Sequence, residues 1–396
     1  MREISRRDLL QTIGAAAGVA AFVPRAALAQ GAPAPAQAPA APRVGPPTVI
    51  SNPPRDFSPG APPVTYPDPD LITIDPAFNS LRLGNASIQR LFTGGMWCEG
   101  PAWSSQGRYL VWSDVAGNKQ YRWLEDDNRV TVFRYPSNNS NGNTFDFQGR
   151  QLSCEHSGRR VVRYEHDGSI TAIAETYQGK RFNSPNDIAV HQDGGIWFSD
   201  PPFGGSLYEG MVDAPGGPGN PQGVLNAKAG QPVGSGLLKR ELDSNVYRVD
   251  PSGRIDMVIS EKDLGGGPNG IAFSPDFKKV YIVARGGLVV SNVGADNKIS
   301  APVVFGNFMV DGVRCGPDGI RVDVNGNVWS GSNAGNNMGY SGVTVHSPEG
   351  KMIGRIRLPE VCANVAFGGP KRNRLFMAAG QSIYAVYVNT QGASPG

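Results

Sequence analysis

One short sequence unit recurs six times in this 396-residue chain and limits what the chain can fold into. Each copy opens with a polar residue and an apolar run, and a turn about eight residues later leads into a second apolar run. We call the opening polar residue the lead residue of its copy. The six lead residues are Glu99, Asn141, Asn186, Asn269, Asp318 and Asn364. Two short β-type runs joined by a turn are typical of a hairpin, so each copy predicts a pair of antiparallel strands.

The spacing of the lead residues predicts how these hairpins assemble. Successive lead residues are 42, 45, 83, 49 and 46 residues apart. An interval of 40 to 50 residues is typical of a four-stranded propeller blade. The long interval contains a Gly- and Pro-rich stretch at about 201–236, after which a strand pattern resumes at Asn245, so we interpret it as one blade with a loop insertion. The sequence therefore predicts an all-β fold, a six-bladed β-propeller, rather than a β-sandwich, which would not repeat one unit six times.

The N-terminus is typical of an export signal. Arg6 and Arg7 precede two leucines, an apolar run extends over 13–23, and Ala27-Leu28-Ala29 forms a small-residue cleavage site. We therefore predict that residues 1–29 are a twin-arginine signal peptide, read by the twin-arginine translocation machinery, and that the protein is periplasmic. An amphipathic N-terminal helix would not also supply a cleavage site.

The rest of the chain divides into a leader and one domain. Residues 30–66 are rich in Pro and Ala and predict a flexible leader. Residues 67–396 then form the propeller, and its first part, 67–95, contains one early strand expected to complete the ring by pairing with the last blade. The insertion at about 201–236 is expected to lie over the face that carries the lead residues.

Charge and cysteine content exclude several classes of function. The formal net charge of +3 falls to +1 without residues 1–29, which hold four arginines and two acidic residues, so neither nucleic acid nor a membrane is an expected partner of the mature protein. The four cysteines show no Cys-x-x-Cys spacing, which argues against structural zinc. They are either buried thiols or form up to two disulfides, and the sequence leaves this open. They are Cys98, Cys154, Cys315 and Cys362.

The chemistry is expected at the lead residues, because equivalent positions of all blades face the central channel at one end. Two carboxylates and several carboxamides form a hard oxygen donor set, suited to Ca²⁺ or Mg²⁺, with Mn²⁺ or Zn²⁺ as further candidates. The alternative is that short polar residues before strands serve only as turn caps. The sequence has no Gly-x-Ser-x-Gly, Walker or His-Glu-x-x-His motif. Of the four histidines, His156 is the candidate to reach the mouth of the pocket.

Four motifs resemble one known family. Glu99-Gly-Pro-Ala-Trp, Ser184-Pro-Asn-Asp, Pro268-Asn-Gly-Ile-Ala-Phe and Gly316-Pro-Asp-Gly-Ile-Arg-Val-Asp resemble the regucalcin/gluconolactonase family of six-bladed propeller hydrolases, especially its secreted bacterial gluconolactonases. The resemblance covers roughly residues 75–388.

The resemblance implies a set of site residues. One divalent cation, Ca²⁺ in the first place, would be held by Glu99, Asn269 and Asp318, with Asn186 completing the site, and Asp318 would also be the general base. The family's substrate-binding arginine falls on Ser184 here, and the nearest arginine is Arg181. The residues expected at the substrate are Asn141, Asn186, Arg181 and His156.

The leading hypothesis is therefore metal-dependent hydrolysis of a sugar lactone, of the gluconolactone type, to the aldonic acid. A second hypothesis keeps the same site for an esterase or organophosphate hydrolase. A third, from a different class, is a propeller that binds a ligand without catalysis.

Overall fold

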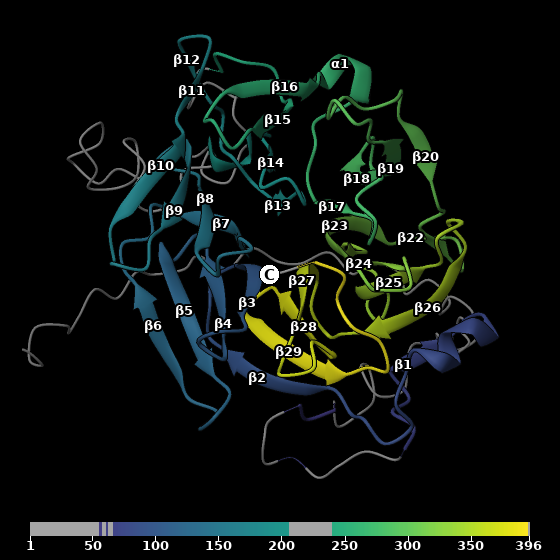
Figure 1. Cartoon of the computed structure of the whole chain (residues 1–396). Coiled ribbons are helices and arrows are strands. Elements are labelled where there is room, and N and C mark those ends of the chain that lie inside the picture. Colours follow the sequence, from purple (N-terminus) through teal and green to yellow (C-terminus); the bar gives the residue numbers. More distant parts are fainter. Residues whose placement is uncertain (1–54, 58–60, 62–65, 206–239, 395–396) are drawn as a thin grey trace, which may run out of the picture. The chain divides into compact units, whose positions relative to one another are not determined.

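Six antiparallel sheets follow one another around a common axis (Figure 1). The computed structural model describes residues 55–57, 61, 66–205 and 240–394. Each sheet contains a blade of four strands, and the sheet of blade five has a fifth strand at its outer edge. In five of the blades the four strands are consecutive along the chain, and the first of them lies nearest the axis (Figure 1). The predicted six-bladed, all-β propeller is confirmed.

The first three blades hold the lead residues Glu99, Asn141 and Asn186. Blade one contains β3 (Cys98–Ser104), β4 (Tyr109–Asp114), β5 (Lys119–Leu124) and β6 (Val130–Arg134). Blade two contains β7 (Ser140–Phe145), β8 (Gln151–Glu155), β9 (Arg160–Tyr164) and β10 (Ile170–Ala174). Blade three contains β13 (Ile188–Val190), β14 (Ile196–Ser199), β15 (Val246–Val249) and β16 (Ile255–Ile259).

The last three blades hold Asn269, Asp318 and Asn364. Blade four contains β17 (Ile271–Phe273), β18 (Lys279–Ala284), β19 (Gly287–Asn292) and β20 (Val303–Phe305). Blade five contains β23 (Gly316–Val322), β24 (Val328–Asn333), β25 (Gly342–His346) and β26 (Met352–Arg357). Blade six contains β27 (Cys362–Gly368), β28 (Arg374–Ala379), β29 (Ser382–Tyr387) and, as its outer strand, β2 (Gln89–Thr93).

The long interval between the third and fourth lead residues contains one blade, as predicted, because β14 pairs directly with β15 across it. The described start of the predicted insertion contains η2 (Phe203–Gly205), and the remainder of the insertion lies outside the described residues. The predicted signal peptide and most of the predicted leader also lie outside them.

The ring is closed by the N-terminal part of the propeller. Strand β2 pairs with β29, with Thr93 opposite Ser382, so blade six combines residues from both ends of the domain (Figure 1). The sequence predicted this pairing but placed only one strand before the first blade. The structure has two, since β1 (Leu71–Thr73) adds to the outer edge of blade five beside β26. A buried ion pair between Arg55 and Asp68 holds the chain next to these edge strands.

A few short elements complete the described part of the chain. The hairpins are β11 (Thr176–Tyr177) with β12 (Lys180–Arg181) and β21 (Met309–Val310) with β22 (Val313–Arg314). The helical turns besides η2 are η1 (Pro76–Ser80) and α1 (Glu261–Leu264). None of the described helices is long and apolar enough to cross a membrane.

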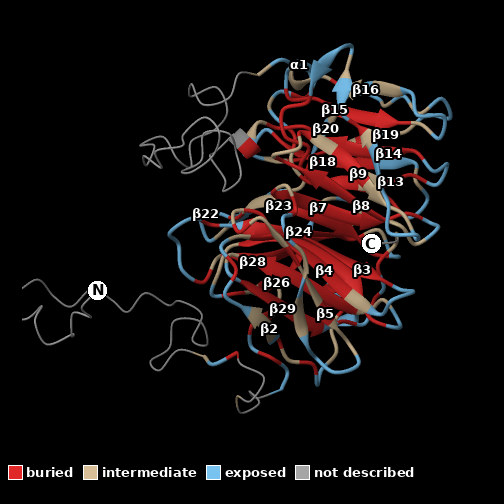
Figure 2. Ribbon diagram, turned by 90° about the vertical axis from the view of Figure 1, so that its left-hand side faces the viewer, coloured by how far each residue is buried: buried red, intermediate tan, exposed pale blue. Residues whose placement is uncertain are grey.

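Burial falls from the axis to the rim (Figure 2). Every residue of β3 and of β27 is buried, whereas β6 has no buried residue. Large side chains fill the spaces between blades: Trp329 of blade five packs edge-on against Phe367 of blade six, with ring centroids 5.6 Å apart. Burying a side chain of this size contributes roughly 1.5–3 kcal/mol, so contacts between blades hold the ring together.

The interface between blades one and two contains a buried polar network beside its apolar contacts. Asn143 lies at its centre, fully buried, and its amide nitrogen donates to the carbonyl oxygen of Gly100 at 2.8 Å and to Ser113 Oγ at 2.9 Å. The Asn143 amide oxygen accepts from Gln120 at 3.0 Å and from Gln151 at 3.1 Å. A buried polar group must be hydrogen-bonded to avoid a desolvation cost, so this network fixes how the two blades meet.

We expect Asn143→Ala to lower the free energy of unfolding by about 1–3 kcal/mol or more, because it leaves buried partners such as Gln120 without their hydrogen bonds. Urea unfolding followed by circular dichroism measures the loss. The exposed amide of Asn292 provides the control, and Asn292→Ala should change stability by less than about 0.5 kcal/mol. Equal effects of the two substitutions would contradict a structural role for the network.

Candidate active site

The lead residues meet because the residue that follows each of them allows the blades to approach closely. In four of the six copies this residue is glycine, and a Cβ atom there would overlap the next lead residue. The Cβ distances would be 2.0 Å from Gly100 to Asn141 O, 2.3 Å from Gly142 to Asn186 O, 2.3 Å from Gly270 to Asp318 O and 2.0 Å from Gly319 to Asn364 Cγ. Only glycine permits this backbone approach.

Hydrogen bonds make the other two contacts of the ring. Asp187, which replaces glycine in blade three, accepts from the backbone N–H of Ile271 in blade four at 3.3 Å. Asn364 of blade six hydrogen-bonds to the carboxylate of Glu99 in blade one. The six lead residues therefore form a closed ring at one end of the axis.

Two acidic lead residues lie close together in this ring. Asn269 Nδ2 donates to Asp318 Oδ1 at 2.6 Å, which joins blades four and five. Burial raises the pKa of Asp318 to about 7; the Asn269 hydrogen bond lowers it and the charge of Asp187 raises it. Burial also raises the pKa of Glu99 well above its usual value, and the neighbouring charge of Asp318 adds to this.

A third carboxylate, Asp187, is paired with a buried arginine. Arg321 extends from blade five and lies 3.5 Å from Asp187 Oδ2, and another of its nitrogens lies 3.5 Å from the carbonyl oxygen of Asn143 in blade two. Arg321 therefore crosses the channel beneath the ring. Burial raises the pKa of Asp187, and the charge of Arg321 opposes that shift.

A cavity of about 440 Å³ opens over Asn269 and Asp318. Its wall on the blade-five side presents one guanidinium, that of Arg314 on the β21–β22 hairpin, together with the carboxamides of Asn333 and Asn337. Arg314 donates to the carbonyl oxygen of Gly286, which anchors it at the wall. The cavity is lined by Asn269, Arg314, Gly316, Pro317, Asp318, Asn333, Ala334, Gly335 and Asn337.

The donor set fits a divalent cation. Three carboxylates and one guanidinium leave two negative charges uncompensated, and a divalent cation would balance them. Within the described residues no three His, Cys, Asp or Glu side chains converge as ligands, and Asp187 is already bound to Arg321 and backbone N–H groups. A cation would therefore use Glu99 and Asp318 together with carboxamides, which are the oxygen ligands of Ca²⁺ and Mg²⁺.

The predicted substrate residues occupy different places. Asn141 and Asn186 are buried in the ring, and the amide oxygen of Asn141 has no hydrogen-bond partner among the described residues. An additional donor or cation at the ring would satisfy this oxygen.

None of the four predicted substrate residues lines the described cavity, and the other two lie outside the ring as well. His156 is buried, and burial lowers its pKa to about 3, so its ring is neutral in ordinary buffers. It lies with Ser184 under η2, where a Cβ atom on Gly204 would be 2.7 Å from the His156 Cβ. Arg181 is exposed on β12 and donates to the carbonyl oxygen of Gly158 at 2.8 Å.

Sequence reasoning missed the pair formed by Asp187 and Arg321, although the repeat contains a signal for it. Asp187 stands where four of the other copies have glycine. Arg321 stands where other copies have the small residues Ala102, Thr144 or Ala272. Asp187 and Arg321 thus both depart from the repeat, carry opposite charges and face the channel, which together indicate an ion pair. The role of Arg314 had no such signal, because the hairpin that carries it lies outside the repeat.

The four cysteines are all buried free thiols. The sequence left open whether these residues are buried thiols or form disulfides, and in this structure they are buried thiols. Burial raises the pKa of Cys98 and of Cys362, so both are protonated and unreactive in neutral solution.

The fold and the ring define a six-bladed propeller with an oxygen-rich polar centre on its axis. The family model described as SMP-30/Gluconolactonase/LRE-like region matches residues 97–381, and the chain belongs to this family.

Known relatives agree with this assignment. A solved gluconolactonase from Xanthomonas campestris is 31% identical, with a TM-score of 0.67, and the match covers 83% of this chain and 98% of that one. A gluconolactonase of Zymomonas mobilis is 26% identical over 348 residues, 81% of this chain and 87% of the relative. A pentonolactonase of Haloferax volcanii is 25% identical over 70% of this chain and 80% of the relative.

The charge of the ring predicts a pH dependence of stability. Because the pKa of Asp318 is about 7 in the folded protein and near 3.9 in an unfolded chain, its ionisation should lower stability as pH rises from about 4 to about 7. In protein stripped with a chelator, we expect Asp318→Asn to reduce this loss. We also expect the substitution to abolish the stabilisation by a divalent cation, about 2.7 kcal/mol at a hundredfold excess over Kd.

Thermal unfolding from pH 5 to pH 8, with EDTA and then with each cation, measures both effects. Asp126→Asn is the matched control, since the Asp126 side chain is 73% exposed and lies in a turn of blade one. A cation that stabilises Asp318→Asn as much as the parent protein would contradict the assignment.

Proposed function

We propose that the protein is a lactonase that hydrolyses a sugar lactone, of the gluconolactone type, to the aldonic acid with the help of one divalent cation, Ca²⁺ in the first place. The observation that carries the proposal is the cavity over the hydrogen-bonded pair Asn269 and Asp318, beside the carboxylate of Glu99. The lactonases among its relatives support the reaction class.

Glu99, Asn269 and Asp318 would hold the cation, with Asn186 completing the set. When bound, a divalent cation supplies Lewis-acid polarisation of a carbonyl and stabilises the oxyanion that develops on it.

Asp318 would act as the general base. Its carboxylate takes a proton from the attacking water as the oxygen adds to the lactone carbonyl carbon. The bond to the ring oxygen then breaks, and the ring oxygen takes from Asp318 the proton that came from the water, which gives the hydroxyl of the product and restores the carboxylate. Asn269 fixes the orientation of the Asp318 carboxylate through its 2.6 Å hydrogen bond. A bound cation would lower the pKa of Asp318 from its raised value and so favour the carboxylate, which is the form that a general base needs.

Arg314, Asn333 and Asn337 would bind the hydroxyl groups of the sugar. They place hydrogen-bond donors along the cavity wall next to Asp318. Arg314 would thereby supply a guanidinium from the β21–β22 hairpin. The position of the family's arginine holds Ser184, whose hydroxyl donates to the carbonyl oxygen of Pro201 at 2.6 Å.

The proposed reaction predicts that the protein hydrolyses glucono-δ-lactone above the spontaneous rate, which a pH-stat measures. Activity should disappear with EDTA and return with one of Ca²⁺, Mg²⁺, Mn²⁺ or Zn²⁺. Asp318→Ala should lose about 10²–10⁴-fold in kcat from the missing proton transfer alone. Activity on aryl esters or phosphotriesters in place of lactones would select the second hypothesis, and ligand binding that survives EDTA without turnover would select the third.

The second prediction separates substrate binding from chemistry. We expect Arg314→Gln to raise KM about tenfold with little change in kcat or in the affinity for the cation, because it removes contacts made equally in the ground and transition states. The control is Arg254→Gln, since the Arg254 side chain is 68% exposed in a turn of blade three. An unchanged KM would remove Arg314 from the substrate site.

We also propose export to the periplasm by the twin-arginine translocation machinery, supported by Arg6, Arg7 and the cleavage site at Ala29. In a Gram-negative host, cell fractionation should find the processed protein in the periplasm. Replacing both arginines with lysine should leave the precursor in the cytoplasm. Processed periplasmic protein from that variant would exclude this route.

A further inference from the structure

A second pocket lies at the opposite end of the inner strands from the ring. Glu99 and Asn141 stand at the start of β3 and β7, whereas this pocket is formed where the same strands end. At about 3.3 Å per residue, a six-residue strand separates the two ends by roughly 20 Å. Arg321 crosses the channel between them. The pocket is therefore separate from the proposed active site.

The pocket is small, and three aromatic side chains form part of its wall. Its volume is about 220 Å³, room for roughly seven waters at about 30 Å³ each. Trp103 comes from blade one and Phe145 and Phe147 from blade two, and Phe147 is 47% exposed although it is a large apolar residue. An exposed aromatic side chain at the mouth of a pocket favours a ligand with an apolar body.

One uncompensated positive charge lies at this pocket. Arg372, in the turn between β27 and β28 of blade six, lines it, and one of its terminal nitrogens is buried without a hydrogen-bond partner among the described residues. No described carboxylate forms an ion pair with Arg372. Burial lowers its pKa, and no acidic neighbour opposes that shift. Arg372 is half-buried, and a buried guanidinium nitrogen without a partner or counter-charge is costly; an anion in the pocket would lower that cost.

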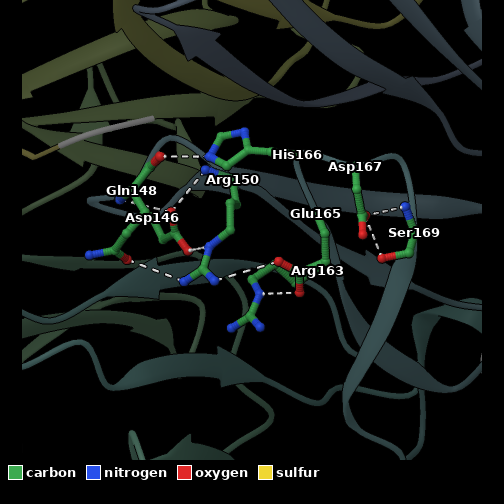
Figure 3. Close-up of polar contacts among 8 residues, drawn as sticks. All are labelled: Asp146, Gln148, Arg150, Arg163, Glu165, His166, Asp167 and Ser169. Carbon is green, nitrogen blue, oxygen red and sulfur yellow. Dashed lines mark hydrogen bonds and ion pairs between the residues drawn. The ribbon is translucent and has the colours of Figure 1, made fainter.

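The carboxylate that lines the pocket, Asp146, cannot serve as that anion because Arg150 already holds it (Figure 3). Asp146 Oδ2 accepts from Arg150 Nε at 2.7 Å, and its Oδ1 accepts from two backbone N–H groups. Arg150 also lies 3.5 Å from Glu165, which in turn binds Arg163 (Figure 3). Asp146 and Glu165 therefore each have an arginine partner other than Arg372.

We propose that this pocket binds a small organic carboxylate with a flat apolar body. The carboxylate supplies the counter-charge of Arg372, and the body packs against Phe147 and the edges of Phe145 and Trp103.

Ligand-observed NMR titrations of the full chain with benzoate test the proposal. Benzoate should bind saturably, and its uncharged analogue benzamide should bind about 10- to 100-fold more weakly, as expected for loss of a charged hydrogen bond. Arg372→Gln should weaken benzoate by the same factor and leave lactone hydrolysis unchanged. Lys371→Gln, at an exposed neighbouring residue outside the pocket lining, should leave benzoate binding unchanged.

Three results would overturn the proposal. The first is no binding of benzoate up to about 10 mM, a concentration at which a binding free energy of only about 3 kcal/mol is detectable. The second is equal affinity for benzamide, and the third is unchanged affinity of Arg372→Gln for benzoate.

If Arg372→Gln does not unfold cooperatively, Phe147→Ala decides instead, because this exposed side chain can be truncated without disturbing the core. It should weaken benzoate about tenfold through the lost apolar contact, and unchanged binding would exclude the site. If gluconate binds more tightly than benzoate and its binding depends on Arg372, the ligand does not need an apolar body and that part of the proposal is wrong.

Discussion

The close approach of neighbouring blades at the axis is the constraint on which the rest of this structure depends. In four of the six blades a glycine after the lead residue lets the blade place its backbone against the next lead residue, at distances that a Cβ atom would forbid. This approach brings six polar side chains from distant parts of the sequence into one ring. The aromatic and aliphatic side chains that fill the outer space between blades then keep the ring from opening.

Bringing polar residues together in this way concentrates negative charge. Glu99, Asp187 and Asp318 lie near one another in a buried setting, and only Arg321 opposes them among the described residues. Arg321 pairs with Asp187, whereas Glu99 and Asp318 have no ion-pair partner among the described residues. The fold thus concentrates acidic groups at the place where the cavity opens.

The sequence predicted the blades well because the same unit recurs in every blade. The period and the turn positions located the blades, including the interrupted third one, and the closing strand before the first blade. It could not locate β1, a three-residue strand at an outer edge with no repeat of its own. The same limit applies to the site. Lead residues such as Glu99 and Asp318 follow the period, whereas Arg314 reaches the cavity on an irregular hairpin whose direction depends on packing.

The pairing of β2 with β29 has a consequence for the order of folding. Thr93 and Ser382 are partners although almost the whole domain separates them in the chain. Five blades are each built from consecutive strands and can form as synthesis proceeds, but the sixth needs residues made first and residues made last. Contacts of such long range slow folding, because the chain between the two strands loses entropy when the loop closes, before the strand pairing stabilises it. The ring, and with it the candidate site, can therefore close only after the last strand of the domain has been synthesised.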